Sequence, residues 1–338
     1  MPPRRDDARE TTSVIITPSN KDASAFRRAS SIMRSGIRAT IRAPPRARAV
    51  RSLASASCLF LSSLWPEPDS SAAGVRTEAL LQAFRDWGYD VSYAASAAPK
   101  PVYLERLRSI GVVPLECRPN DEGAISRVLE ASQPSVVVFD RFFTEEAFSF
   151  RVREIAPEAV RVLDMQDVHS LRRARQQLVE RAGGSIGDAV AHRPSAASDD
   201  LLRELASVHR SDLTLVCSPV ELCMLHRSYG IPAQKLSLAS FFCDEAASDA
   251  EPAATGFGFG AQNGFEQRRH FMTIGGFKHP PNVDAVRWLA SSIWPLIRAQ
   301  LPDAEMHVYG AYPTQAVQQL HKPKVRTRSP PHLLLTTW

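Results

Sequence analysis

The sequence of 338 residues has little cysteine, no long hydrophobic run and no acidic residue over much of its amino-terminal part. Its five cysteines form no CxxC pair, and the closest two, Cys217 and Cys223, are six residues apart. This spacing fits neither a zinc site nor a disulfide framework, so we expect buried thiols in a reducing compartment and no metal site. The apolar stretch SLASASCLFLSSLW is shorter than the roughly 20 residues that span a bilayer, and we interpret it as a first buried strand.

Acidic residues are absent between Asp22 and Glu67. Residues 1–56 carry a charge of +8 from eleven Arg, one Lys and four acids, whereas the whole chain carries +5, so the remainder carries −3. The part expected to fold is therefore mildly acidic, which argues against nucleic-acid binding. An Arg-rich, Ser-rich, acid-poor leader is typical of a plastid or mitochondrial transit peptide. The alternatives are a disordered tail or an untranslated extension, which would leave the protein in the cytoplasm.

Residues 57–243 alternate between short apolar runs and amphipathic stretches. The stretch VRTEALLQAFRDWG has a helical period, and PSVVVFDR is a β-branched run typical of a parallel strand buried on both faces. This alternation predicts a Rossmann-like, doubly wound α/β domain. Ligands of such domains bind at the carboxyl ends of the strands, which here are followed by Trp65–Arg76, Phe139–Thr144 and Asp164–Arg172.

A second α/β unit is predicted after a linker at residues 244–268, whose glycines do not fit G-x-G-x-x-G after a strand. Residues 269–320 contain strand, helix and strand patterns, and Pro295 is expected to kink or end that helix. Residues 321–338 form an irregular tail whose apolar end has no evident partner. The predicted fold class is α/β with two Rossmann-like domains, the second incomplete and its apolar strand faces partly exposed to water.

Four stretches in this order resemble a known family: SSLWPEPDSSAAGVRTEALLQAFRDWGYDVSYAAS, RVLDMQDVHSLRRAR, RELASVHRSDLTLVCSPVELCMLHRSYGIPAQKL and FMTIGGFKHPPNVDAVRWLASSIWPLIRAQLPDAEMHVYG. Together they resemble a GT-B glycosyltransferase of the group 1, family 4-like type. The resemblance implies two facing domains, with a hydroxyl acceptor such as a glycan on the first and a nucleotide-diphosphate sugar on the second. It implies sugar transfer without a tightly bound metal. We expect no other cofactor, and from the short apolar stretch no transmembrane segment, although peripheral membrane contact is compatible with the sequence.

Five residues are candidates for binding the substrate or the donor. Gly74 lets the backbone approach a ligand closely, and Arg76 offers a positive charge at a helix start; the alternative is a simple turn and a solvated arginine. Gly275 and Gly276 would pack against the diphosphate, with Lys278 supplying a cation. The alternative there is that the following Pro-Pro-Asn only shapes a helix entry, with Asn282 as its N-cap.

His169 is the candidate catalytic residue, because histidine transfers protons near neutral pH. Asp167 or Asp164 would orient it, with Asp167 as the catalytic partner, and the alternative is a loop histidine that caps the next helix. Ser218 and Glu221 form an S-x-x-E pattern that predicts a capping box.

Three functions are compatible with these patterns. In the family the chain continues after the position of Gly310 with a Gly-rich loop and an acidic pair that grips the donor, and this sequence has no matching positions. The first function is a glycosyltransferase, inactive if truncated. The second is a non-catalytic remnant that binds a glycan or a protein. The third is a nucleotide-sugar epimerase, which needs acid–base carboxylates that the second domain does not show.

Overall fold

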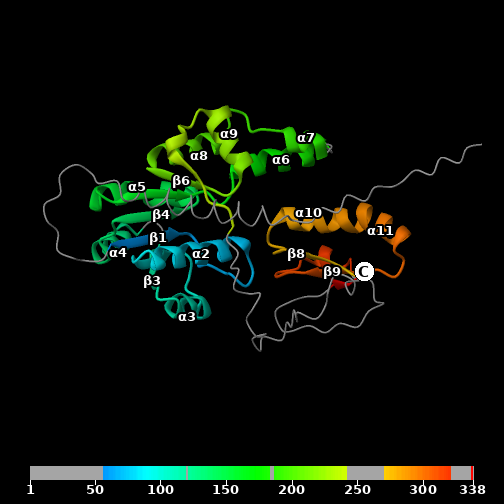
Figure 1. The fold of residues 1–338 in the computed structure, drawn as a ribbon, viewed down its shortest axis with the longest axis horizontal. Helices are drawn as coiled ribbons and strands as arrows, with labels where there is room; N and C mark the ends of the chain where they lie inside the picture. The colour runs from blue at the N-terminus through cyan, green and yellow to red at the C-terminus, as the bar shows by residue number, and fades with distance from the viewer. Residues whose placement is uncertain (1–55, 119–120, 183–185, 242–269, 321–335, 338) are drawn as a thin grey trace, which may run out of the picture.

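A computed structural model describes residues 56–118, 121–182, 186–241, 270–320 and 336–337. These residues form a seven-stranded sheet and a separate three-stranded sheet, each with its own helices (Figure 1). The predicted α/β class with two layered units is therefore confirmed. The leader at residues 1–56, apart from residue 56, and the linker at residues 244–268 lie outside the described residues, as does most of the tail at residues 321–338.

The large sheet is parallel throughout, in the order β3-β2-β1-β4-β5-β6-β7. The strand order reverses between β1 and β4, which is the topological switch point where doubly wound sheets bind ligands. The strands are β1 (Ser57–Ser62), β2 (Asp90–Ala95), β3 (Val113–Glu116), β4 (Val136–Asp140), β5 (Val160–Asp164), β6 (Leu213–Val216) and β7 (Leu236–Leu238).

Helices follow most strands and cover both faces of the large sheet (Figure 1). The short helix α7 lies in the connection between α6 and α8. The helices are α2 (Ala72–Asp86), α3 (Pro101–Ser109), α4 (Glu122–Ser132), α5 (Phe142–Ile155), α6 (His169–Ala182), α7 (Ile186–Ala191), α8 (Asp199–Arg210), α9 (Pro219–Tyr229) and the 3-10 turn η1 (Ala233–Lys235).

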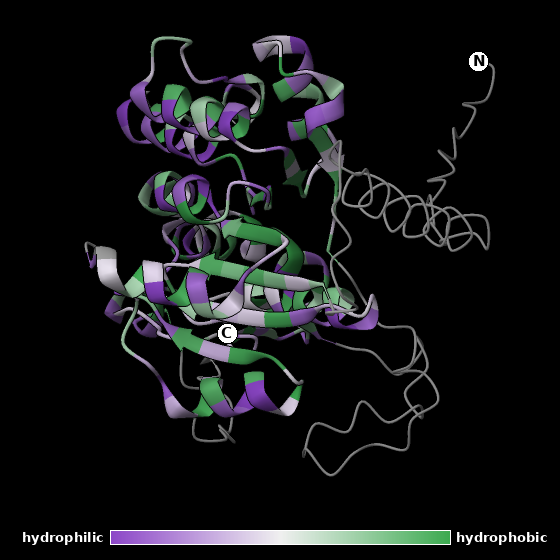
Figure 2. Cartoon of the chain, turned by 90° about the vertical axis from the view of Figure 1, so that its left-hand side faces the viewer, coloured by the Kyte–Doolittle hydropathy of each residue, from purple (hydrophilic) through white to green (hydrophobic). Residues whose placement is uncertain are grey.

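Successive residues of β1 enter two different cores, because side chains of a strand alternate between the faces of a sheet. Leu59 and Leu61 pack in a cluster that includes residues of α4 and α5. Cys58 and Phe60 pack in a second cluster, which includes residues of α2 and α3. Both faces are buried, which explains the uninterrupted apolar runs of the central strands. Figure 2 shows these strands as a hydrophobic layer between helices with hydrophilic outer faces.

The small sheet has the order β10-β9-β8, with strands β8 (Phe271–Ile274), β9 (Met306–Tyr309) and β10 (Thr336–Thr337). Strands β8 and β9 are parallel, as predicted, and β10 pairs with β9 in the antiparallel direction. The prediction that the end of the tail has no partner is wrong, because Thr336 pairs with Val308.

One face of the small sheet is covered by the helical segments α10 (Pro280–Trp288), η4 (Leu289–Ile293) and α11 (Trp294–Gln300), with α12 (Gln315–Gln318) beside them. Pro295 was expected to kink or end the helix, and the helix does not end there, because α11 continues to Gln300. The segment η4 before it is a π-helical turn, and Pro295 stands in the first turn of α11, where a missing N–H is tolerated.

No helix among the described residues covers the other face of the small sheet. Met272 is 58% exposed and Ile274 is 73% exposed, whereas Met306 and Val308 on the helix side are buried. The prediction that apolar strand residues of this unit are partly exposed to water is confirmed for β8 and is wrong for β9, whose apolar residues Met306 and Val308 are buried. Within the described residues, no helix is long and apolar enough to span a membrane.

Candidate functional site

A buried polar network joins the carboxyl ends of β1, β4 and β5. Asp140 accepts a hydrogen bond from the Ser62 hydroxyl (2.7 Å) and contacts Arg141 Nη1 (2.9 Å). The side-chain amide of Gln166 donates to Asp140 Oδ1 and to Asp164 Oδ2, at 3.1 Å each. These hydrogen bonds link the carboxyl ends of β1, β4 and β5 to one another at the topological switch point.

Arg76 closes this network from helix α2. Its side chain is 0% exposed, and its Nη2 lies 2.8 Å from Asp164 Oδ1. Its Nη1 donates to the carbonyl groups of Ala239 and Ser240, which follow β7. Burial raises the pKa of Asp164, and the nearby Arg76 charge opposes that rise. Arg76 therefore ties α2 to the sheet, and this geometry does not support the predicted contact between its guanidinium and a ligand.

Left-handed backbone occurs after two strands of the large sheet and after one strand of the small sheet. Arg141 after β4 has φ +71°, and Gln166 after β5 has φ +62°. Tyr312 after β9 has φ +58°. Left-handed backbone is unfavourable for such residues and persists where the surroundings impose it, which is common at functional sites. Two of the three loops predicted to meet a ligand, those after β4 and β5, therefore each contain a residue with left-handed backbone.

His169 is the first residue of α6, and it lies beside Asp167 as the sequence predicted. His169 Nε2 lies 2.9 Å from Asp167 Oδ1, and Arg172 Nε donates to Asp167 Oδ2 (2.7 Å). The imidazole ring also meets the ring of Phe142 edge-on, at 5.6 Å between centroids. Asp164 is engaged by Arg76 instead, so the two alternatives for the orienting carboxylate are resolved in favour of Asp167.

The Asp167 carboxylate is stabilised in its ionised form. Burial would raise its pKa, but the hydrogen bonds and charges of His169 and Arg172 outweigh burial and lower the pKa to about 2. Asp167 is therefore an anion at any pH near neutral, and it can stabilise a protonated imidazole at His169.

Two glutamates hold the start of α6 in place. The buried Glu204 of α8 accepts hydrogen bonds from the backbone N–H groups of His169 (2.7 Å) and Ser170 (2.9 Å). Glu221 accepts one from Val168 N–H at 3.4 Å. The Ser218 hydroxyl caps α9 at Glu221 N–H as predicted, but the Glu221 side chain points to the His169 loop, so the capping box is only half formed.

The loop between β1 and α2 folds tightly upon itself at Gly74. A Cβ atom at Gly74 would lie 2.4 Å from the backbone carbonyl of Glu67. The Ser71 hydroxyl accepts a hydrogen bond from Gly74 N–H (3.0 Å) and so caps α2. Glycine is required here because the backbone of Glu67 comes close to Gly74. The predicted contact between Gly74 and a ligand remains a prediction.

Glu67 and Lys278 bring the two units together. Tyr312 Oη donates to Glu67 Oε2 (3.4 Å), and Lys278 Nζ lies 3.5 Å above the Tyr312 ring. Glu67 also binds Lys100 and the Ser70 hydroxyl. Burial would raise the pKa of Glu67, but Lys100, Ser70 and Lys278 together lower it. Lys278 thus lies at the junction, facing an ionised carboxylate.

The predicted glycines of the second unit also lie at this junction. A Cβ atom at Gly276 would lie 3.2 Å from the Ser70 carbonyl of the first unit, and one at Gly275 would lie 2.9 Å from the Asn282 side chain. The Asn282 amide donates to the Gly276 carbonyl (2.9 Å). The alternative that Asn282 is an N-cap is wrong, because α10 begins at Pro280 and His279 occupies the N-cap position.

His279 connects this junction to the His169 cluster. Burial lowers its pKa, and the charges of Arg172 and His169 lower it further, against an opposing effect of Asp167. His279, the neighbour of Lys278, therefore lies close enough to the His169 cluster for their charges to interact.

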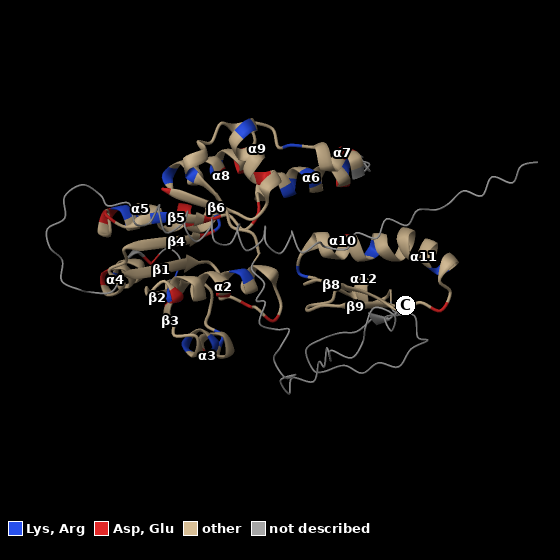
Figure 3. Cartoon of the chain, viewed as in Figure 1, with Lys and Arg blue, Asp and Glu red and all other residues tan. Residues whose placement is uncertain are grey.

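A pocket of about 390 Å³ adjoins the His169 cluster between α6 and the chain leading into α8. Ser170, the neighbour of His169, lines it together with arginines of α6 and of the segment before α8. Figure 3 shows basic residues on α6, as on other helices such as α3 and α5. Among the lining arginines, Arg173 is paired with Asp200 at 2.6 Å.

Sequence reasoning missed Glu67, Gln166, Arg141 and Tyr312. The first three lie in loops that the strand-end rule had selected, so their positions were indicated although their roles were not. Tyr312 follows the last predicted strand, and its contact with Glu67 joins residues 245 positions apart, which no local pattern reveals.

No family model and no curated protein matches the chain. Among solved structures, it is similar to sucrose-phosphate synthase from Thermosynechococcus elongatus, with 11% identity over 77% of this chain and 63% of that chain and a TM-score of 0.47. It is similar to the lipopolysaccharide outer core galactosyltransferase WaaB, with 12% identity over 78% and 71% of the two chains and a TM-score of 0.43.

The chain is also similar to UDP-GlcNAc 2-epimerase from Methanocaldococcus jannaschii, with 11% identity over 78% and 67% of the two chains and a TM-score of 0.40. It spans less than two thirds of the synthase, and 48% of the Glycyrrhiza uralensis protein UGT73P12. The similar structures thus include glycosyltransferases, the class named by the sequence resemblance, and epimerases. At these identities the likeness concerns the fold alone.

Proposed function

We propose that this protein transfers a sugar from a nucleotide-diphosphate sugar to an acceptor hydroxyl at the junction of its two units. The observation that carries the proposal is the meeting of two sets of groups. The His169–Asp167–Arg172 cluster comes from the carboxyl edge of the large sheet, and Lys278 with His279 comes from the carboxyl edge of the small one. Strand ends of this kind are where α/β proteins bind ligands.

His169 acts as the general base in this proposal. With the ring proton on Nε2, which lies 2.9 Å from the ionised Asp167, the lone pair of the neutral ring is on Nδ1, which takes the proton of the acceptor hydroxyl. The acceptor oxygen then bonds to the anomeric carbon, and the bond from that carbon to the diphosphate oxygen breaks with its electron pair. Asp167 stabilises the imidazolium that results.

Lys278 compensates the charge that grows on the leaving diphosphate. The N-terminus of α10 contributes less than expected, because Pro280 and Pro281 occupy its first two positions and have no N–H to donate. The acceptor is placed beside α6, where the pocket next to His169 is lined by serine hydroxyls and guanidinium groups that suit a polyhydroxylated molecule.

Calorimetric titration with UDP- and GDP-sugars tests donor binding. Lys278→Met should weaken binding about 10- to 100-fold, the value of a charge-assisted hydrogen bond, whereas the control Arg298→Met on the exposed side of α11 should not change it. His169→Ala should keep the donor affinity and lower the transfer rate by about 10²- to 10⁴-fold. Absence of heat with every donor would refute the proposal.

A second candidate function is non-catalytic binding of a glycan or a protein. It is favoured by the engagement of Arg76 and Gly74 with the chain itself, which leaves fewer groups for a donor than the family resemblance implies. Glycan binding that survives both His169→Ala and Lys278→Met, without turnover of any nucleotide sugar, would identify this function.

A further inference from the structure

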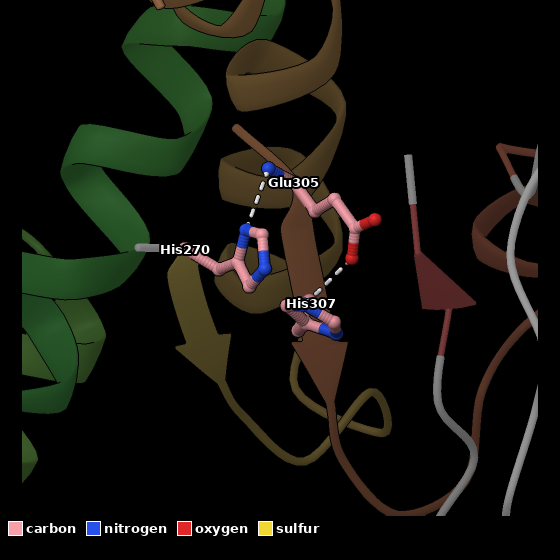
Figure 4. Close-up of side chains that lie close together, drawn as sticks. All are labelled: His270, Glu305 and His307. Carbon is pink, nitrogen blue, oxygen red and sulfur yellow. Dashed lines mark hydrogen bonds and ion pairs between the residues drawn. The ribbon is translucent and has the colours of Figure 1, made fainter. Parts of the chain in front are cut away.

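Three side chains with metal-binding groups meet on the open face of the small sheet (Figure 4). They are His270, Glu305 and His307, and one ligand atom from each lies within 4.8 Å of the others. They stand at the amino ends of β8 and β9, whereas Gly275 and Lys278 stand past the carboxyl end of β8. The cluster is therefore separate from the junction of the two units, and its chemistry is independent of the sugar transfer proposed there.

The register of the two strands explains why these residues meet. Phe271 pairs with Met306 and Met272 with His307, so His270 is level with Glu305. Glu305 and His307 are two residues apart and project to the same face, while Met306 between them is buried under the helices. The three side chains therefore converge on the face that the helices leave open, as Figure 4 shows.

The spacing of the cluster suits a tetrahedral cation. His307 Nε2 lies 3.3 Å from Glu305 Oε2. Two ligands that are each about 2.0–2.1 Å from zinc, at a tetrahedral angle, lie roughly 3.3–3.4 Å apart. The same 3.3 Å is at the long end of hydrogen-bond distances. The distance between His307 Nε2 and Glu305 Oε2 therefore matches the separation of two zinc ligands better than a typical hydrogen bond.

We propose that His270, Glu305 and His307 bind a divalent transition-metal cation of the Zn²⁺ type, with water as the fourth ligand. Two imidazoles and one carboxylate form a donor set that suits Zn²⁺, whereas Mg²⁺ and Ca²⁺ prefer oxygen ligands alone. Binding through Nε2 of His270 moves its ring proton to Nδ1, which breaks the 3.3 Å contact from Glu305 N–H. This contact is long and exposed, so water replaces it.

The bound ion would join β8 to β9 on the face that no helix of the described residues covers. A cation that binds only the folded state stabilises that state. The stabilisation grows with the logarithm of the ratio between the cation concentration and the dissociation constant. The small sheet is the part of the described chain where such a link matters, because Met272 and Ile274 beside the cluster remain exposed. The role proposed is structural.

Titration of the chelator-treated full chain with Zn²⁺, and with Co²⁺ for its absorption bands, tests the site. We expect one Zn²⁺ equivalent, a tetrahedral Co²⁺ spectrum and a higher Tm with Zn²⁺, and none of these with Mg²⁺. His307→Ala and Glu305→Gln should each weaken binding at least about 10- to 100-fold, the loss that even outer-shell changes cause.

The matched control is His209→Gln, which removes an exposed histidine of α8 far from the cluster in sequence. It should bind Zn²⁺ as the unaltered chain does. Glu305→Gln keeps the size of the side chain, so it remains informative if His307→Ala unfolds the small sheet. Equal Zn²⁺ binding by all variants, or no Co²⁺ spectrum in the unaltered chain, would overturn the proposal.

Discussion

The two sheets of this protein are built from the same strand–helix–strand unit but differ in how they are covered. The large sheet has helices on both faces, and a buried polar network that includes the Arg76–Asp164 pair lies at the carboxyl ends of its strands. The small sheet has helices on one face and leaves Met272 and Ile274 exposed on the other. One strand–helix–strand unit is therefore enough to form a sheet with helices on one face. Burial of both faces of a sheet requires several such units, with helices on each side.

The comparison predicts its largest effect at Arg76. Arg76→Met should lower the free energy of unfolding by about 3–5 kcal/mol, because it leaves the Asp164 carboxylate buried without its partner. Chemical denaturation followed by circular dichroism measures this loss. The control is Arg106→Met, which breaks an exposed pair with Glu78 and should cost less than about 1 kcal/mol. Similar losses in both variants would mean that the buried network does not organise the large sheet.

A second prediction contrasts two glycines. Gly74→Ala should destabilise the chain by about 1–3 kcal/mol, since its methyl group would overlap the Glu67 backbone at 2.4 Å. Gly276→Ala should cost less, because its nearest neighbour is the Ser70 carbonyl at 3.2 Å, across the junction of the two units. Denaturation curves of both variants decide the order. A larger loss at Gly276 would indicate that the junction is more tightly packed than the loop.

The pH dependence of stability tests the contacts of the Asp167 carboxylate at the carboxyl ends of the large sheet. The pKa of Asp167 is lowered to about 2 in the folded chain, so its contribution is complete above its ordinary value near 3.8 and is lost as the pH falls from there towards 2. Asp167→Asn should reduce the loss of stability within this range. Urea unfolding at about pH 5, 3.5 and 2.5 measures it, with Asp303→Asn on the surface as the control. An unchanged profile would show that His169 and Arg172 do not hold this carboxylate.

The smallest effect is expected on the open face of the small sheet. Ile274→Thr should change the free energy of unfolding by no more than about 0.5 kcal/mol, as expected at an exposed position, and should reduce self-association. Val308→Thr, on the covered face of the same sheet, should cost about 1–3 kcal/mol because it buries a hydroxyl group. Light scattering and denaturation test the pair. A large loss at Ile274 would mean that something covers the open face in solution.

Much of the fold was predictable because its signals are local. The β-branched run of β4 and the helical period of α2 each reflect burial on particular faces, and burial imposes a short repeat on the sequence. The π-helical turn before Pro295 was missed, since the helical pattern does not show how a chain accommodates a proline. The pairing of Thr336 with Val308 was missed as well, because two residues carry no strand pattern.

The candidate site was predictable only in part. His169 and Asp167 were found because they are two residues apart after a strand, and their contact confirms that reasoning. Arg76 looked like a ligand-binding cation, because the sequence does not show that Asp164, 88 positions away, would bury it. The cluster of His270, Glu305 and His307 gave no signal either, since strand register alone aligns residues 35 positions apart.

The sequence by itself determined the class of the fold, the order of its strands and helices along the chain, and the loops in which polar groups would gather. These properties depend on neighbouring residues, whose periodic burial is written into short stretches. The tertiary structure decided which charges became buried pairs, which loops met between the two units, and which face of the small sheet stayed open. Such properties depend on residues far apart in the chain, and only the packing of whole elements brings their side chains together.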